Sequence, residues 1–136
     1  MTLSVDTAEQ GAWTVLRVSG ELDLVSSPAV RQRVHDAVAV GRHDIVLDLS
    51  RVLFCDSSGV GVLIASRRLL RSCGGRLRLI LPVQGAEGVP QSEWSRELAA
   101  GAHVNRVLAA LGVRRLFEVY ADVASATADE ARPLSA

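Results

Sequence analysis

Between residues 44 and 81 the sequence has the pattern of a buried strand, an amphipathic helix and a second strand. Residues 44–49 are a nearly continuous apolar run of strand length, which is typical of a central strand covered on both faces. Residues 57–73 place apolar side chains on one helical face and arginines on the other, and Gly74-Gly75 ends the helix. With a strand at 76–81, this order predicts a β-α-β unit with a right-handed crossover, and hence an α/β fold.

A hairpin and a helix are predicted before this unit. Strands over 3–7 and 13–19 are separated by a turn at Gln10-Gly11, and within the second strand the apolar Val15 is set against the polar Thr14. The helix follows Ser26-Ser27-Pro28 and ends at Gly41. A serine hydroxyl is expected to cap the free N–H groups of its first turn, and the proline fits the first helical position.

Shorter elements are predicted after the unit. A helix over 104–111 leads to a strand over 116–120, and residues 122–131 form a terminal helix. The connection before them, 84–100, is long for a compact domain. It is either a functional loop or an additional helix, in which a buried Trp94 would extend the core.

Composition excludes several functions. The chain has 136 residues, 15 basic and 15 acidic, so its net charge is zero and its length suits one domain. A neutral chain has no long-range field to attract nucleic acid or an anionic membrane, so we expect neither as a direct partner. All the basic residues are arginines, which excludes a Schiff-base lysine and a P-loop lysine. Without a signal peptide or a spanning run, we expect a cytoplasmic location.

The segment Cys55-Asp56-Ser57-Ser58-Gly59-Val60-Gly61 lies where the buried strand passes into the helix. Free backbone N–H groups and the positive end of the helix dipole tolerate added negative charge there, so a serine could be modified or contact a partner. The alternative is that Asp56, Ser57 or Ser58 only caps the helix. The sequence around the serines is not G-x-S-x-G, and the cysteines and histidines have no metal-ligand spacing.

A second polar cluster, Gly20-Glu21-Leu22-Asp23, follows the strand predicted at 13–19. Its carboxylates are either solvated loop side chains or part of a shared site. The β-α-β order allows Asp23 and Asp56 to meet at one edge of the sheet.

Several segments of the chain together carry a family resemblance: Gly20-Glu21-Leu22-Asp23, Asp48-Leu49-Ser50, Phe54 to Leu63, Gly74-Gly75-Arg76-Leu77, Val104 to Leu108 and Leu111-Gly112-Val113. In combination they resemble the STAS-domain anti-sigma factor antagonists, or anti-anti-sigma factors, of bacteria. The resemblance implies a STAS fold, with a mixed four- to five-stranded sheet and about four helices, and no cofactor or catalysis. It also implies a STAS domain over 1–125, with 84–100 as an insertion and 126–136 as a C-terminal tail.

The resemblance further implies a partner-switching function. The unphosphorylated protein, a monomer or weak homodimer, would bind an anti-sigma factor that is also a serine kinase and so release the sigma factor. The kinase would phosphorylate Ser58, with Ser57 as the lesser candidate, and a PP2C-type phosphatase would restore the active form. Asp23, Asp56, Ser57, Ser58 and Gly59 would form the partner-binding surface. Charge repulsion at that surface, rather than refolding, is the expected mechanism.

A second function remains open at this point. A STAS protein can instead serve as the accessory subunit of a lipid or anion transport complex, for which the basic helix face of Arg67, Arg68 and Arg71 would be suited. The intact D-S-S-G motif favours the first function.

Overall fold

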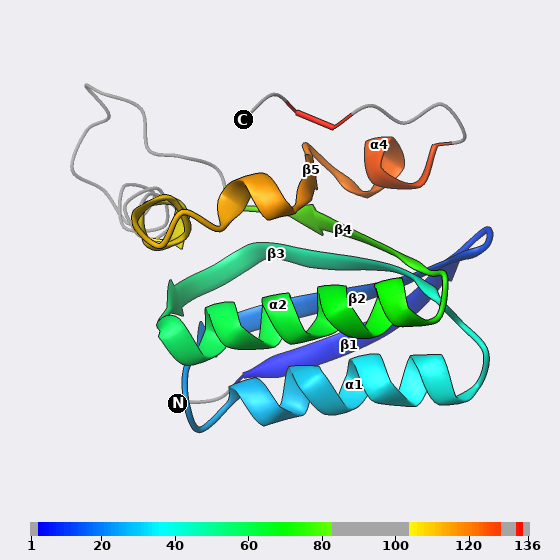
Figure 1. Ribbon diagram of the computed structural model, residues 1–136, viewed down its shortest axis with the longest axis horizontal. Coiled ribbons are helices and arrows are strands. Elements are labelled where there is room, and N and C mark those ends of the chain that lie inside the picture. Colours follow the sequence, from blue (N-terminus) through cyan, green and yellow to red (C-terminus); the bar gives the residue numbers. More distant parts are fainter. Residues whose placement is uncertain (1–2, 83–103, 129–132, 135–136) are drawn as a thin grey trace.

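A single mixed sheet organises the computed structural model, which describes residues 3–82, 104–128 and 133–134. Its five strands lie in the order in which they occur in the chain. The hairpin of β1 (Ser4–Gln10) and β2 (Trp13–Leu22) is antiparallel, and its turn contains Gly11 at φ 60°. β3 (Asp44–Cys55), β4 (Arg76–Ile80) and β5 (Glu118–Tyr120) follow, each parallel to the preceding strand (Figure 1). The fold is the mixed α/β architecture that the sequence predicted.

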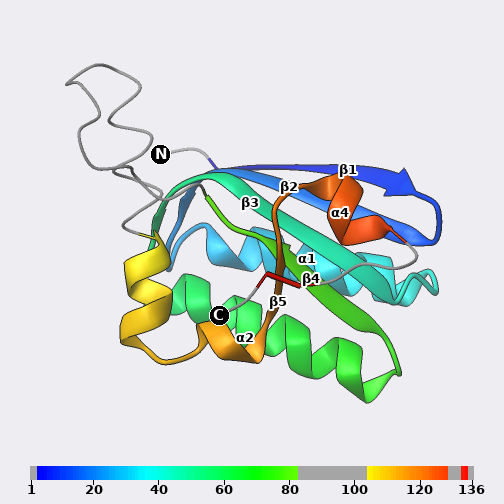
Figure 2. The same cartoon turned by 90° about the horizontal axis from the view of Figure 1, so that it is seen from above.

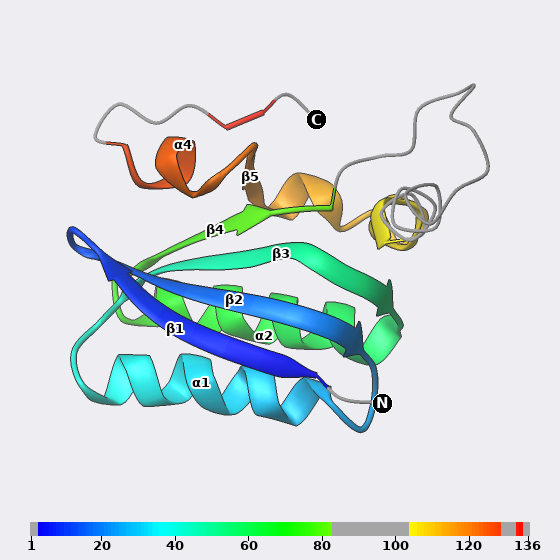
Figure 3. The same cartoon turned by 180° about the vertical axis from the view of Figure 1, so that it is seen from behind.

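Helices cover the two faces of this sheet unequally. α1 (Ser27–Ala39) and α2 (Ser57–Ser72) lie side by side on one face (Figure 2), and Figure 3 shows the sheet from its other side. The much shorter α4 (Val123–Thr127) packs against the opposite face. Residues 104–110 are helical, as predicted, and a 3₁₀ turn at Arg114–Leu116 leads from them towards β5.

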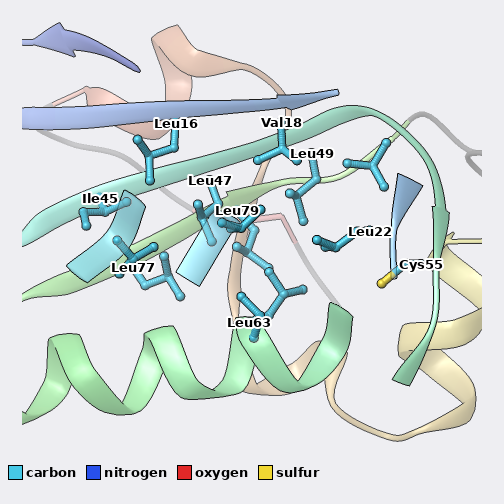
Figure 4. Close-up of a cluster of buried hydrophobic side chains, with 14 of the residues drawn as sticks. Leu16, Val18, Leu22, Ile45, Leu47, Leu49, Cys55, Leu63, Leu77 and Leu79 are labelled. Carbon is cyan, nitrogen blue, oxygen red and sulfur yellow. The ribbon is translucent and has the colours of Figure 1, made fainter. Parts of the chain in front are cut away.

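The main core lies between the sheet and the α1–α2 layer. Alternate residues of the strands point towards the helices, as the two-residue period of a strand requires. Figure 4 shows Leu47 and Leu79 of the sheet above Leu63 of α2, with Leu16 and Ile45 further along the same layer. All five side chains are at most 1% exposed. This interlocked aliphatic layer fixes α2 against β3 and thereby fixes where α2 begins.

A smaller core lies on the opposite face, under α4. It contains an aromatic pair, Trp13 and Tyr120, and the buried Arg78, whose guanidinium lies 4.3 Å and 5.0 Å from the two ring centres. Arg78 also donates a hydrogen bond to the carbonyl of Ala126 (2.7 Å). Ala126 is itself buried in this core, so α4 and Arg78 hold each other in place.

Several boundaries differ from those predicted. β2 continues beyond residue 19 to Leu22, and β3 continues beyond residue 49 to Cys55, because the two extensions pair with each other. Register shifts between 17 and 19 and between 20 and 21 accommodate that pairing. The predicted strand over 116–120 is shortened to β5 by the 3₁₀ turn. The helix predicted over 122–131 is too long, because Ala128 has extended backbone (φ −67°, ψ 146°) and α4 ends at Thr127. The segment 84–100, including Trp94, lies outside the described residues.

Candidate functional site

The junction between β3 and α2 is a single residue, Asp56, with extended backbone. Its Oδ1 accepts a hydrogen bond from the backbone N–H of Gly59 (3.0 Å), and its own N–H donates to the carbonyl of Leu22 (3.2 Å). Asp56 is therefore the helix cap. The hydroxyls of Ser57 and Ser58 make no hydrogen bond with the described residues, so neither is needed as a cap. Ser57 is exposed and Ser58 is half-buried.

Gly59 lets the first turn of α2 lie directly against the end of β2. A Cβ at this position would be 2.7 Å from the Leu22 carbonyl oxygen and 2.8 Å from the Cys55 sulfur. By contrast, a Cβ at Gly61 would meet nothing within 4 Å. Gly59 is buried, so it shapes the surface by permitting close packing rather than by presenting a contact atom.

Cys55 is the last residue of β3 and is 2% exposed. Burial raises the pKa of its thiol to about 11, and the neighbouring Asp56 carboxylate acts in the same direction. A thiol with a raised pKa holds its proton at neutral pH and is a poor redox sensor. We therefore assign Cys55 to packing at the strand end.

The junction between β2 and α1 is longer and is organised by Asp23. Its Oδ1 accepts hydrogen bonds from the backbone N–H groups of Val25 (3.0 Å) and Ser26 (2.9 Å). These hydrogen bonds hold the pKa of the Asp23 carboxyl below its ordinary value, and the bond from the Ser26 N–H has the largest effect. Asp23 is thus ordered by local backbone contacts, although it lies at the surface.

The prediction that a serine hydroxyl caps α1 is wrong. Ser26 occupies the cap position, but its Oγ donates to the Glu21 carbonyl (2.6 Å) and accepts from the Asp23 N–H (2.9 Å). The hydroxyl is therefore turned back towards the end of β2. Pro28 lies in the first helical turn, as expected.

Two apolar side chains in this junction were missed by the sequence interpretation. Leu24 is 72% exposed and Val25 is 89% exposed, whereas most large apolar residues of the described chain are buried. The available signal was the placement of two consecutive apolar residues between Asp23 and Ser26, in a segment that had to be a turn. Adjacent exposed apolar side chains next to a polar rim are typical of protein contact surfaces.

The fold brings the two junctions together at the carboxyl edge of the sheet. Leu22 and Cys55 are paired in the register of β2 and β3, and Asp23 and Asp56 follow directly. α1 and α2 accordingly begin at the same end of the molecule (Figure 1). The β-α-β order allowed Asp23 and Asp56 to meet at one edge, and the register of β2 and β3 places both of them there. We call the surface of Asp23, Leu24, Val25, Asp56, Ser57 and Ser58 the contact edge.

Among the described residues, no group of three or more histidine, cysteine or acidic side chains is placed to hold a metal ion. None of the helices in this part of the chain has the length and apolarity needed to span a membrane.

Comparisons with known proteins identify the family. Residues 4–83 match the family model described as STAS domain. An anti-sigma F factor antagonist of Paenibacillus polymyxa is 33% identical over 78 residues, which cover 57% of this chain and 67% of the relative.

Solved structures share the fold. The crystal structure of an anti-sigma factor antagonist from Mycobacterium paratuberculosis has a TM-score of 0.70, at 24% identity, over 92% of this chain and 91% of that one. The anti-sigma factor antagonist SpoIIAA in its unphosphorylated form has a TM-score of 0.51, at 29% identity, over 60% of this chain and 74% of its own. The family model matches more than half of the residues, and the strands described above lie within and beside that match. The chain belongs to the STAS domain family.

Proposed function

We propose that this protein is an anti-sigma factor antagonist that is switched by phosphorylation of Ser58. In the unmodified state, the contact edge binds an anti-sigma factor that is also a serine kinase, and the sigma factor is released. The kinase transfers the γ-phosphoryl group of ATP to Ser58 Oγ, which loses its proton, and ADP leaves. A PP2C-type phosphatase hydrolyses the phosphate ester and restores binding.

One observation carries this proposal: two serine hydroxyls without hydrogen-bond partners among the described residues lie beside an exposed apolar pair. Asp56 satisfies the helix cap, so a serine can be modified without loss of that cap. Leu24 and Val25 supply apolar area for a partner at the same edge of the sheet. The names of the relatives support the same function, since both the Paenibacillus polymyxa protein and SpoIIAA are anti-sigma factor antagonists.

The local electrostatics support repulsion of the partner as the mechanism. A phosphate adds about −1.5 to −2 charges at pH 7, and the positive end of α2 tolerates that charge, so the fold is expected to persist. A partner that already accommodates Asp23 and Asp56 would meet two further negative charges. A loss of about 2–3 kcal/mol corresponds to roughly a hundredfold weaker binding.

Phosphorylation is tested with candidate anti-sigma factor kinases and ATP. Mass spectrometry should place the phosphate on Ser58 in the wild type and in Ser57→Ala, and Ser58→Ala should remain unmodified. Phosphate on Ser57 alone would move the switch to the neighbouring residue. If neither serine were phosphorylated by any candidate kinase, the proposed switch would be refuted.

Binding is tested separately by titration calorimetry with the same partners. Ser58→Asp should bind about a hundredfold more weakly than the wild type, and Ser58→Ala should bind with unchanged affinity. Equal binding by Ser58→Asp would refute the switch. If the wild type bound none of these partners but bound a membrane transport complex, the accessory-subunit function would be favoured.

A further inference from the structure

A groove of about 260 Å³ opens between the N-terminal parts of α1 and α2. It is lined by Ser27, Pro28 and Arg31 from α1 and by Ser58, Gly61, Val62 and Ala65 from α2. Ser58 thus belongs to the wall of the groove, and Ser57 does not. The absence of a side chain at Gly61 leaves room beside the Ser58 hydroxyl, since a Cβ there would meet nothing within 4 Å.

Arg31 is the one charged side chain among the residues that line this groove. It is exposed, and it makes no hydrogen bond or ion pair with any described residue. Arg33, two residues further along α1, is by contrast engaged, since it donates to the Thr7 hydroxyl (2.9 Å) and to the Val5 carbonyl (3.0 Å). Arg31 is therefore a cation available to a new anion.

The acidic groups near the groove do not compete for Arg31. At the contact edge, the carboxylates of Asp23 and Asp56 accept hydrogen bonds from the backbone N–H groups of their own junctions. On α1, Asp36 accepts a hydrogen bond from the side chain of Gln32 (2.8 Å). None of the three lines the groove.

We propose that a phosphate on Ser58 is received in this groove by the guanidinium of Arg31, which links the N-terminal parts of α2 and α1 by an ion pair. The inference rests on the proposed function, because it takes Ser58 as the phosphorylated residue. A planar guanidinium binds phosphate through paired hydrogen bonds, and the groove is larger than a phosphate group. The guanidinium offsets one charge of the phosphate, which leaves a net charge of about −0.5 to −1. The ion pair holds this charge and the bulk of the phosphate at one place on the contact edge, where together they oppose the partner.

The pairing also distinguishes the two serines. A phosphate on Ser57 would project from the exposed side of α2, outside the groove that contains Arg31. It would be solvated instead of paired. Arg31 therefore favours the modified state only when the phosphate is on Ser58.

The test uses the full chain with phosphoserine incorporated directly at position 58 during translation, so that no kinase is needed. The ³¹P chemical shift is followed against pH in the Arg31 protein, in Arg31→Gln and in Arg68→Gln. Arg68 is the matched control, because it is an exposed arginine of α2 that does not line the groove. A nearby cation favours the dianion.

The phosphate of the Arg31 protein should lose its second proton at a pH lower by roughly half a unit than that of Arg31→Gln, with the effect reduced by solvent exposure. Arg68→Gln should titrate like the Arg31 protein, and phosphoserine at position 57 should be insensitive to Arg31→Gln. If the phosphate on Ser58 titrated at the same pH in the Arg31 protein and in Arg31→Gln, the inference would be overturned. So would an equal effect of Arg68→Gln, which would indicate net charge alone.

Two further results separate this inference from the proposed function. The melting temperature of unphosphorylated Arg31→Gln should stay within about 2 °C of the wild type, because the replaced side chain is exposed. A titration without an Arg31 effect would refute the ion pair while leaving phosphorylation by a kinase intact. Failure of every kinase to modify Ser58 would refute the proposed function while leaving the titration result unchanged.

Discussion

The two junctions of the contact edge differ in length and packing, although both join a parallel strand to a helix and both contain an aspartate. The β3–α2 junction is one residue long, with Asp56 capping the helix and Gly59 packed against Leu22. The β2–α1 junction spans several residues, leaves α1 without a side-chain cap and exposes Leu24 and Val25.

The difference separates two requirements of a switched contact surface. A modifiable serine must be presented at a fixed position, and the tight junction provides that for Ser58. An apolar contact must adapt to the shape of a partner, and the looser junction provides that through Leu24 and Val25. Mutations that act on one junction should therefore have effects that the other does not share.

The largest effect on stability is expected from Gly59→Val, which disrupts the packing of the tight junction. Its Cβ would be 2.7 Å from a backbone oxygen, which cannot move as a flexible side chain can. We expect a loss of about 3 kcal/mol in the free energy of unfolding, measured by urea denaturation. Gly61→Ala, two residues away in open space, should instead stabilise the protein by about 0.5–1 kcal/mol. Equal effects of the two changes would show that the junction is not tightly packed.

Leu24→Asp and Val25→Asp test the looser junction. Each should weaken binding to the anti-sigma factor by about tenfold to a hundredfold, since apolar side chains central to an interface dominate affinity. The free energy of unfolding should change by at most about 0.5 kcal/mol, because both side chains are exposed. Val40→Asp is the matched control. Val40 is 75% exposed at the other end of α1, and its replacement should leave the affinity unchanged. Wild-type affinity of both loop variants would place the interface elsewhere.

A smaller effect is expected from loss of the cap at the tight junction. Asp56→Ala should lower the free energy of unfolding by about 1 kcal/mol, because the Gly59 N–H loses its acceptor. Asp56→Asn keeps an acceptor oxygen and should stay within a few tenths of a kcal/mol of the wild type. Thermal unfolding of the three proteins would decide whether the carboxylate acts as a cap or only as a charge.

The smallest effect is the response of the looser junction to pH. The Val25 and Ser26 N–H groups hold the pKa of Asp23 below its ordinary value. The ionised carboxylate therefore stabilises the turn above the pKa of the unfolded chain, and this contribution is lost as the pH falls through the lower, folded pKa. The amide signals of Val25 and Ser26 should shift together in that acidic range. In Asp23→Asn the shift should be absent.

Much of the fold could be predicted from the sequence where one local pattern was decisive. The apolar run at 44–49, the helical period of 57–73 and the Gly74-Gly75 stop gave the right elements because each is determined by nearby residues. The β-α-β order allowed Asp23 and Asp56 to lie at one edge, and the direct pairing of β2 with β3 places them there.

The features that could not be predicted from the sequence depend on contacts between residues that are distant in the chain. Thr14 was taken as polar against its apolar neighbours, but it is 1% exposed and accepts a hydrogen bond from Arg42. Arg78 is buried because α4, about 48 residues later in the chain, covers that face of the sheet. Next to the contact edge, Ser26 and Ser27 are both residue types that commonly cap helices. The turn of Asp23 determined instead where the Ser26 hydroxyl points.

The strands lie side by side in the order in which they are synthesised, and this has a consequence for folding on the ribosome. β2, β3 and the start of α2 leave the ribosome before β4 and β5, so the contact edge can assemble on the nascent chain. Until Arg76–Ile80 has been synthesised, however, β3 has an unpaired side that could recruit a strand from another chain. The surface that we propose for regulation is therefore complete early, whereas protection against misassembly arrives late.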